Sequence, residues 1–155
     1  MGTELKNLLI VYHSRSGTVQ KMAEAVLAGA RTCEQVNVET LDPLNAPIKA
    51  VKQADAIIIG SPENFGYMSG AIKFFFEEIY YECLNTSRGL AYALFIAADN
   101  DGSGAVSSIE RITTGLGWKS VADPIITKDG ITKSTLESCK ELGMTLSEGL
   151  ELGLY

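Results

Sequence analysis

The sequence predicts an α/β protein with three layers, in which a five-stranded parallel sheet lies between two layers of helices. Two observations predict this fold. Short apolar runs without polar alternation recur along the chain, as is typical of strands buried on both faces. Amphipathic stretches with helical spacing separate these runs. Because strand and helix alternate throughout the 155 residues, we expect one domain spanning residues 1–155.

Five apolar runs are the predicted strands. In chain order they are residues 8–12 (LLIVY), 36–41 (VNVETL), 56–60 (AIIIG), 90–98 (LAYALFIAA) and 120–127 (SVADPIIT). The second and the fifth are the weaker signals, because polar residues interrupt them. Each run is short enough to favour a strand over a helix.

The stretches between these runs are the predicted helices. Their apolar stripes are Val19, Met22, Ala23, Val26 and Ala30; Ile72, Phe75, Phe76, Ile79 and Cys83; Val106, Ile109, Ile112 and Leu116; and Leu136, Cys139, Leu142, Leu146 and Leu150. Ser69 is the predicted N-cap of the second helix. Ser134 and Glu137 have the spacing of a capping box, which predicts the start of the last helix. Residues 42–55 contain two prolines and leave room for only a short helix.

The composition excludes several classes of function. A net charge of −6 provides no broad basic surface for nucleic acid. No apolar run approaches the roughly 20 residues of a membrane span, and the first residues do not resemble a signal peptide. Three scattered cysteines, Cys33, Cys83 and Cys139, indicate reduced, buried thiols. We therefore expect a cytoplasmic protein that binds neither nucleic acid nor membrane.

The loop after the first strand is the first candidate for a binding site, because ligands of parallel sheets bind beyond the carboxyl ends of the strands. The loop HSRSGTV (13–19) presents the hydroxyls of Ser14, Ser16 and Thr18 where a helix begins. Gly17 permits close approach of a ligand. Unpaired amides and the helix dipole favour an anion there. Taken alone, the loop fits a phosphate site and a simple helix cap equally well.

The loop after the third strand, GSPENFGYMSG (60–70), is long for a connection of this kind. It places Phe65 and Tyr67 on either side of Gly66. Aromatic side chains on a loop indicate a flat ligand that lies against them. The alternative is that both rings fold back over the edge of the sheet.

The loop after the fourth strand, AADNDGSGAVSS (97–108), is polar and rich in glycine, so its backbone is available for hydrogen bonds. Asp99, Asp101, Ser103, Gly104 and Glu110 also match the spacing of a calcium-binding EF-hand loop. An EF-hand needs a preceding helix, and a strand is predicted there. Calcium binding is therefore the weaker interpretation.

Together the three loops resemble those of the flavodoxin-like FMN-binding family, and the resemblance extends over nearly the whole chain. The segment SRSGTV (14–19) is similar to that family's phosphate loop, T/S-x-T/S-G-x-T. SPENFGYMSGAIKFFFE (61–77) is similar to the P-x-x-F-G-x-M-S-G stretch of the NAD(P)H:quinone oxidoreductase branch, the tryptophan-repressor-binding-protein type. DNDGSGA (99–105) corresponds to the second flavin-contacting loop. The resemblance implies FMN as cofactor and the strand order 2-1-3-4-5.

The resemblance also implies which residues bind the cofactor. The phosphate loop comprises Ser14, Arg15, Ser16, Gly17, Thr18 and Val19; Pro62, Glu63, Asn64, Phe65 and Gly66 flank the isoalloxazine; and Asp99, Asn100 and Gly102 lie on its other side. Val19 departs from the family pattern, which ends in Thr, and Thr18 is the residue placed to compensate. We expect the Gly66 carbonyl to accept a hydrogen bond from reduced flavin, and Glu63 to lower the flavin potential.

The function implied by the resemblance is electron transfer from NAD(P)H through FMN to a quinone or a similar acceptor, with no side chain assigned a catalytic role. The chain has no room for a separate nicotinamide domain, so donor and acceptor would use the same flavin face in turn. Two alternatives are open: an electron carrier of the flavodoxin type, and a non-redox α/β module. The expected partner is a small molecule or a redox protein, and a homo-oligomer is also open.

Overall fold

The computed structural model of the chain describes residues 4–155. Its elements alternate as the sequence predicts. They are β1 (Lys6–Tyr12), α1 (Thr18–Ala30), β2 (Val36–Leu41), α2 (Ile48–Lys52), β3 (Ala56–Pro62), α3 (Gly70–Cys83), β4 (Ala91–Ala98), α4 (Ser103–Leu116), β5 (Lys119–Ser120), β6 (Ile125–Lys128) and α5 (Lys133–Glu151). The predicted apolar stripes supply most of the buried residues of α1, α3 and α5. In α4 they supply two of four, Ile109 and Leu116, because Val106 and Ile112 are only partly buried.

The strands form one parallel sheet in the order β2-β1-β3-β4-β5, which confirms the predicted sheet and its strand order. The prediction of the fifth strand as one run over residues 120–127 is wrong in one respect. The strand is broken into β5 and β6, which both pair with β4. The ladder is interrupted before β6 because Pro124 has no amide hydrogen to donate.

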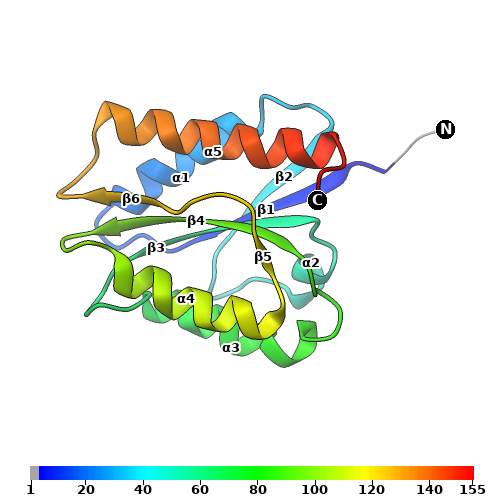
Figure 1. Cartoon of the computed structure of the whole chain (residues 1–155), viewed down its shortest axis with the longest axis horizontal. Helices are drawn as coiled ribbons and strands as arrows, with labels where there is room; N and C mark the ends of the chain where they lie inside the picture. Colours follow the sequence, from blue (N-terminus) through cyan, green and yellow to red (C-terminus); the bar gives the residue numbers. More distant parts are fainter. Residues whose placement is uncertain (1–3) are drawn as a thin grey trace.

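The helices cover both faces of the sheet: α1 and α5 lie on one side, and α3 and α4 lie on the other (Figure 1). Consecutive strand residues point to opposite faces, so Ile58 of β3 packs beneath α1 and α5 while Ile57 packs beneath α3 and α4. Within residues 4–155, no helix combines the length and the apolar character that a membrane crossing requires.

Helices α1 and α5 approach each other closely at two glycines. A Cβ on Gly29 would lie 1.9 Å from the carbonyl oxygen of Lys140. A Cβ on Gly143 would lie 2.0 Å from the carbonyl oxygen of Val26. Both distances are far below van der Waals contact, so only glycine fits at these positions without moving a backbone. This packing fixes α1, and with it the loop that precedes α1, against the rest of the fold.

The helix starts confirm one predicted cap and correct another. The Ser69 hydroxyl accepts a hydrogen bond from a backbone amide of the first turn of α3, as predicted. The predicted capping box of Ser134 and Glu137 is wrong, because the N-cap of α5 is Thr132. The Thr132 hydroxyl accepts the amide three residues further on at 3.1 Å, which places Ser134 inside the first turn.

The three cysteines are free and buried, as predicted. Burial raises the pKa of the Cys139 thiol to about 11. Between pH 9 and 11 the unfolded chain therefore releases a proton that the folded chain retains, so this group's contribution to stability is lost as the pH rises through that range.

From pH 8 to pH 10.5, urea unfolding should show that the Cys139→Ala variant loses about 2 kcal/mol less stability than the unmodified protein. Equal losses in the two proteins would contradict the assignment.

Candidate functional site

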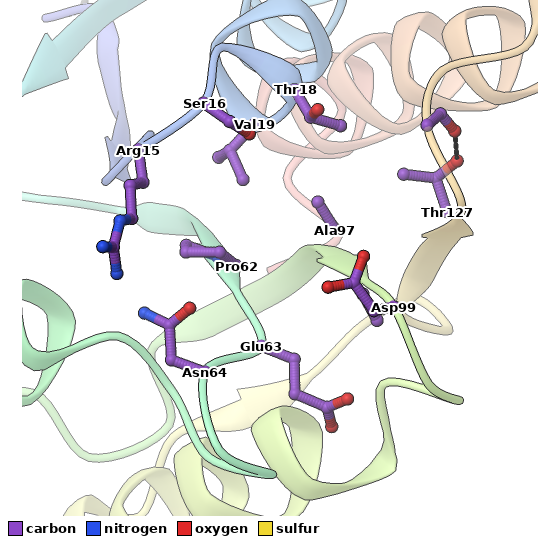
Figure 2. Close-up of a pocket in the computed structure, with 12 residues that line it drawn as sticks. Arg15, Ser16, Thr18, Val19, Pro62, Glu63, Asn64, Ala97, Asp99 and Thr127 are labelled. Atoms are coloured by element: carbon purple, nitrogen blue, oxygen red, sulfur yellow. Dashed lines mark hydrogen bonds between the residues drawn. The ribbon is translucent and has the colours of Figure 1, made fainter.

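The carboxyl ends of β1, β3, β4 and β6 surround a cleft of about 250 Å³ (Figure 2). Its lining residues are Arg15, Ser16, Thr18, Val19, Pro62, Glu63, Asn64, Ala97, Ala98, Asp99, Thr127 and Gly130. The strand order reverses between β1 and β3, so the cleft lies at the switch point where such sheets bind ligands. Its volume is small for a small-molecule site, and a nucleotide would therefore also contact the surrounding loops.

The loop after β1 ends at an open helix start. Gly17 is the N-cap of α1; its φ of 99° lies in the left-handed region, and it has no side chain to cap the helix. The Ser14 hydroxyl accepts the amides of Gly17 and Gln20 at 3.2 and 3.1 Å. Within residues 4–155, no acceptor bonds the amides of Thr18 and Val19. These two amides are available to an anion, and the helix dipole favours one there.

The side chains around this helix start line the cleft, and one of them is also part of the core. Ser16 and Thr18 line the cleft, and Arg15 reaches toward it from the same loop (Figure 2). Val19 is 2% exposed; it packs in the core beneath α1 and also forms part of the cleft lining. The position at which the family pattern has Thr is therefore a core position in this chain. The predicted compensation by Thr18 is consistent with its place in the cleft lining.

The loop after β3 contains a tight turn at residues 64–67. Asn64 and Tyr67 exchange both backbone hydrogen bonds, at 2.8 and 2.9 Å. Phe65 and Gly66 have φ values of 54° and 69°, as in a type I′ hairpin turn. The Phe65 ring is fully exposed, so it does not fold back over the edge of the sheet. Neither aromatic ring lines the cleft; Tyr67 lines a neighbouring hollow.

The Glu63 carboxylate points toward the start of α4 (Figure 2). Its Oε2 atom accepts the amides of Gly104 and Ala105, at 2.9 and 3.2 Å. The Gly66 carbonyl also faces this helix, since a Cβ on Gly104 would lie 2.0 Å from the Gly66 oxygen. The two groups expected to contact the flavin ring therefore both contact the first turn of α4.

The loop after β4 contributes Asp99 to the cleft, whereas the predicted site residues Asn100 and Gly102 do not line it, and Gly102 is the N-cap of α4. Asp101 caps the helix locally. Its Oδ1 atom accepts the amide and the hydroxyl of Ser103 at 2.9 and 2.7 Å. The hydrogen bond from that amide is the main reason that the pKa of the Asp101 carboxyl is lowered.

The calcium-binding loop is not formed. A strand, β4, precedes residue 99, and α4 begins at Ser103, so Glu110 lies within a helix. Within residues 4–155, no group of three or more His, Cys, Asp or Glu side chains is placed to hold a metal ion.

Sequence reasoning missed the wall of the cleft that β6 contributes. Thr127 and Gly130 line the cleft from this side, together with Ala97 and Ala98 from the end of β4. The Thr127 hydroxyl donates to the Gly130 carbonyl. A signal was present in the sequence: the fifth strand must also end at this edge, and the Asp-Gly pair at residues 129 and 130 is a turn signal.

The donors in the cleft fit a ligand with one anionic end. Open amides and the hydroxyls of Ser16 and Thr18 lie at the start of α1, and the Arg15 side chain lines the cleft on the side of Pro62 and Asn64 (Figure 2). A parallel sheet of this strand order, with open amides at its switch point, is the architecture of the flavodoxin-like class of α/β proteins. The family model described as Flavodoxin matches residues 10–143, and the chain belongs to the flavodoxin family. That family implies FMN as the cofactor.

Comparisons with individual proteins also find flavodoxins. The chain is 27% identical over 157 residues to a flavodoxin from Aquifex aeolicus (strain VF5), covering 91% of this chain and 85% of that protein. Its structure is similar to that of a flavodoxin from the domain Archaea, with a TM-score of 0.80, 25% identity and coverage of 94% and 99% of the two chains. A WrbA-like flavodoxin from Agrobacterium tumefaciens has the same fold, with a TM-score of 0.77, 20% identity and coverage of 95% and 98%.

Proposed function

We propose that this protein binds FMN in the cleft, as a single domain, and transfers electrons from NAD(P)H to a quinone or a similar acceptor. The observation that carries the proposal is the open start of α1 at the switch point of the sheet. FMN, when bound, supplies the redox chemistry. The chain's own contribution is to bind and orient it.

Each wall of the cleft has a distinct role in this proposal. The amides of Thr18 and Val19 and the hydroxyls of Ser16 and Thr18 hold the phosphate, and Arg15 adds a positive charge. Residues 62–64 and Asp99 form two sides of the cleft where the ring system is bound. Because Pro62 and Ala97 are apolar, they exclude water from part of that region.

A second hollow, of about 490 Å³, supports a small-molecule electron donor. Residues 62–64 line the cleft, whereas Gly66 and Tyr67 line this hollow, so the 64–67 turn separates the two. Lys73 and Arg111 also line the hollow. Arg111 suits a phosphate of NAD(P)H, whereas Lys73 already pairs with Glu77 at 2.9 Å.

The alternative function is an electron carrier without a substrate of its own. The similarity to the Aquifex flavodoxin and the archaeal flavodoxin favours it. A redox protein would then be the partner in place of a quinone, and a homo-oligomer is compatible with either function. The three free cysteines support a reducing, cytoplasmic location for both.

Steady-state kinetics distinguish the two functions. The protein incubated with FMN and freed of excess cofactor should be yellow, and it should oxidise NADH or NADPH when a quinone is added. The Arg111→Gln variant should bind FMN normally but show a KM for the nicotinamide raised on the order of tenfold, from loss of one charged contact. A yellow protein that turns over only with an added reductase is a carrier. A protein that stays colourless contradicts the whole proposal.

A further inference from the structure

The start of α4 needs a hydrogen-bond acceptor that its own N-cap cannot supply. Gly102 is that N-cap, with a φ of 78°. A Cβ there would lie 2.7 Å from the Ile126 side chain of β6, so a larger residue does not fit. Without a side chain, the N-cap leaves the amides of the first turn to other acceptors. Asp101 satisfies the first of them, at Ser103.

Glu63 satisfies the next two. Its Oε2 atom accepts both Gly104 and Ala105, although 41 residues separate Glu63 from Gly104 in the chain. These bonds involve a carboxylate and a helix N-terminus, a pairing that the helix dipole strengthens. Glu63 is only partly buried, but its bonded oxygen has two donors within 3.2 Å. A residue of the cleft wall thus acts as the cap of a distant helix.

Two further contacts join the same loop to the same helix. The Gly66 carbonyl packs on Gly104 at a distance that excludes any side chain there. The Met68 amide donates to the Ser108 hydroxyl at 3.0 Å, one turn further along α4. The wall formed by residues 62–68 is therefore attached to α4 at three successive points, and the Glu63 contact is the one that lies in the cleft lining.

We propose that Glu63 is a positioning residue, whose carboxylate attaches the cleft wall after β3 to the start of α4 and so fixes where the flavin ring is held. The proposal rests on FMN binding as the function of the cleft. It assigns Glu63 a role through geometry, whereas the resemblance implied a role through its charge. The two roles make different predictions for the uncharged isostere.

The bonding pattern makes that comparison possible. Both amides bond the same oxygen, and within residues 4–155 the other oxygen of Glu63 accepts no hydrogen bond. In Glu63→Gln, the amide oxygen can accept both donors while the NH₂ group takes the position of the unbonded oxygen. This variant removes the charge and retains the attachment. Glu63→Ala removes both.

The test is the dissociation constant of FMN, measured by quenching of flavin fluorescence, together with the visible circular dichroism of the bound flavin. Glu63→Ala should weaken binding roughly 10- to 100-fold, the range found when outer partners of metal ligands are removed, and it should change the dichroism. Glu63→Gln should stay within about threefold of the unmodified protein, with the same dichroism. Asp101→Ala is the matched control. It removes a carboxylate cap from the start of α4, and it leaves the contacts between α4 and the loop after β3 in place.

Each other result overturns the proposal. If Glu63→Gln weakens binding as much as Glu63→Ala, the charge is what matters. If Asp101→Ala matches Glu63→Ala, the effect is fraying of α4. If Glu63→Ala binds FMN normally, the attachment has no role in binding. Failure of the unmodified protein to bind FMN is a separate result, because it contradicts the proposed function itself.

Discussion

Ser16→Asp should weaken FMN binding by about 100-fold while leaving the affinity for riboflavin nearly unchanged. Ser16 is exposed and lines the cleft beside the open start of α1. A carboxylate there would stand next to the phosphate, which carries a charge of roughly −1.5 to −2 at neutral pH. Two unit charges 4 Å apart repel by about 1 kcal/mol in water and about 4 kcal/mol near a protein surface. An intermediate value of about 2.7 kcal/mol corresponds to 100-fold.

Titration of the protein with FMN and with riboflavin measures this difference directly. Ser16→Asn is the control, because it has nearly the shape of Asp without its charge. It should bind both flavins much as the unmodified protein does. Equal weakening of FMN and riboflavin by Ser16→Asp would mean that the phosphate is not bound at the start of α1.

Gly143→Ala should lower the free energy of unfolding by about 3 kcal/mol, at the upper end of the usual cost of overpacking. The new Cβ would lie 2.0 Å from the Val26 carbonyl oxygen and 2.7 Å from the Ala30 amide nitrogen, and both are backbone atoms of α1. Neither can rotate away as a flexible side chain could, so α1 and α5 must separate. FMN affinity should fall as well, because α1 carries the phosphate loop.

Gly70→Ala is the matched control for this prediction. Gly70 also lies in a helix, but a Cβ there would meet no atom within 4 Å. Gly70 is the first residue of α3, where the preference for alanine is smaller than the roughly 1 kcal/mol of a helix interior, so this variant should be as stable as the unmodified protein or slightly more so. Urea unfolding followed by circular dichroism compares the two variants. A Gly143→Ala variant within 1 kcal/mol of its parent would show that the helices separate at little cost.

The fold was predictable because its signals are local. Each predicted strand corresponds to an apolar run, and the Ser69 cap could be identified from the residue and its position alone. The break between β5 and β6 had a local signal in Pro124, but its effect depends on the partner strand β4. The predicted start of the last helix was wrong by two residues. Ser134 was predicted as its cap, but Thr132, which has an equally suitable hydroxyl, is the cap.

The site was predictable in outline, because parallel strands bring their following loops to one edge. Ser16, Thr18 and Asp99 could be assigned to the cleft on that basis. The direction in which the Glu63 side chain points could not be predicted, since its partners follow it by 41 and 42 residues. The exposure of the Phe65 ring could not be predicted either. Phe65 has a left-handed backbone conformation, which a phenylalanine seldom adopts. Contacts of this kind depend on tertiary packing.

The starts of α1 and α4 differ in whether their backbone amides are free to bind an anion. At α1 the amides are open and Arg15 stands beside them, whereas at α4 two carboxylates already occupy the amides. One of these two carboxylates, that of Glu63, lines the cleft together with the carboxylate of Asp99 (Figure 2). Donor groups therefore gather at the α1 end of the cleft, and carboxylates lie toward α4. This arrangement favours a ligand that places a single anionic end at α1, and it disfavours a second anionic group at the opposite end.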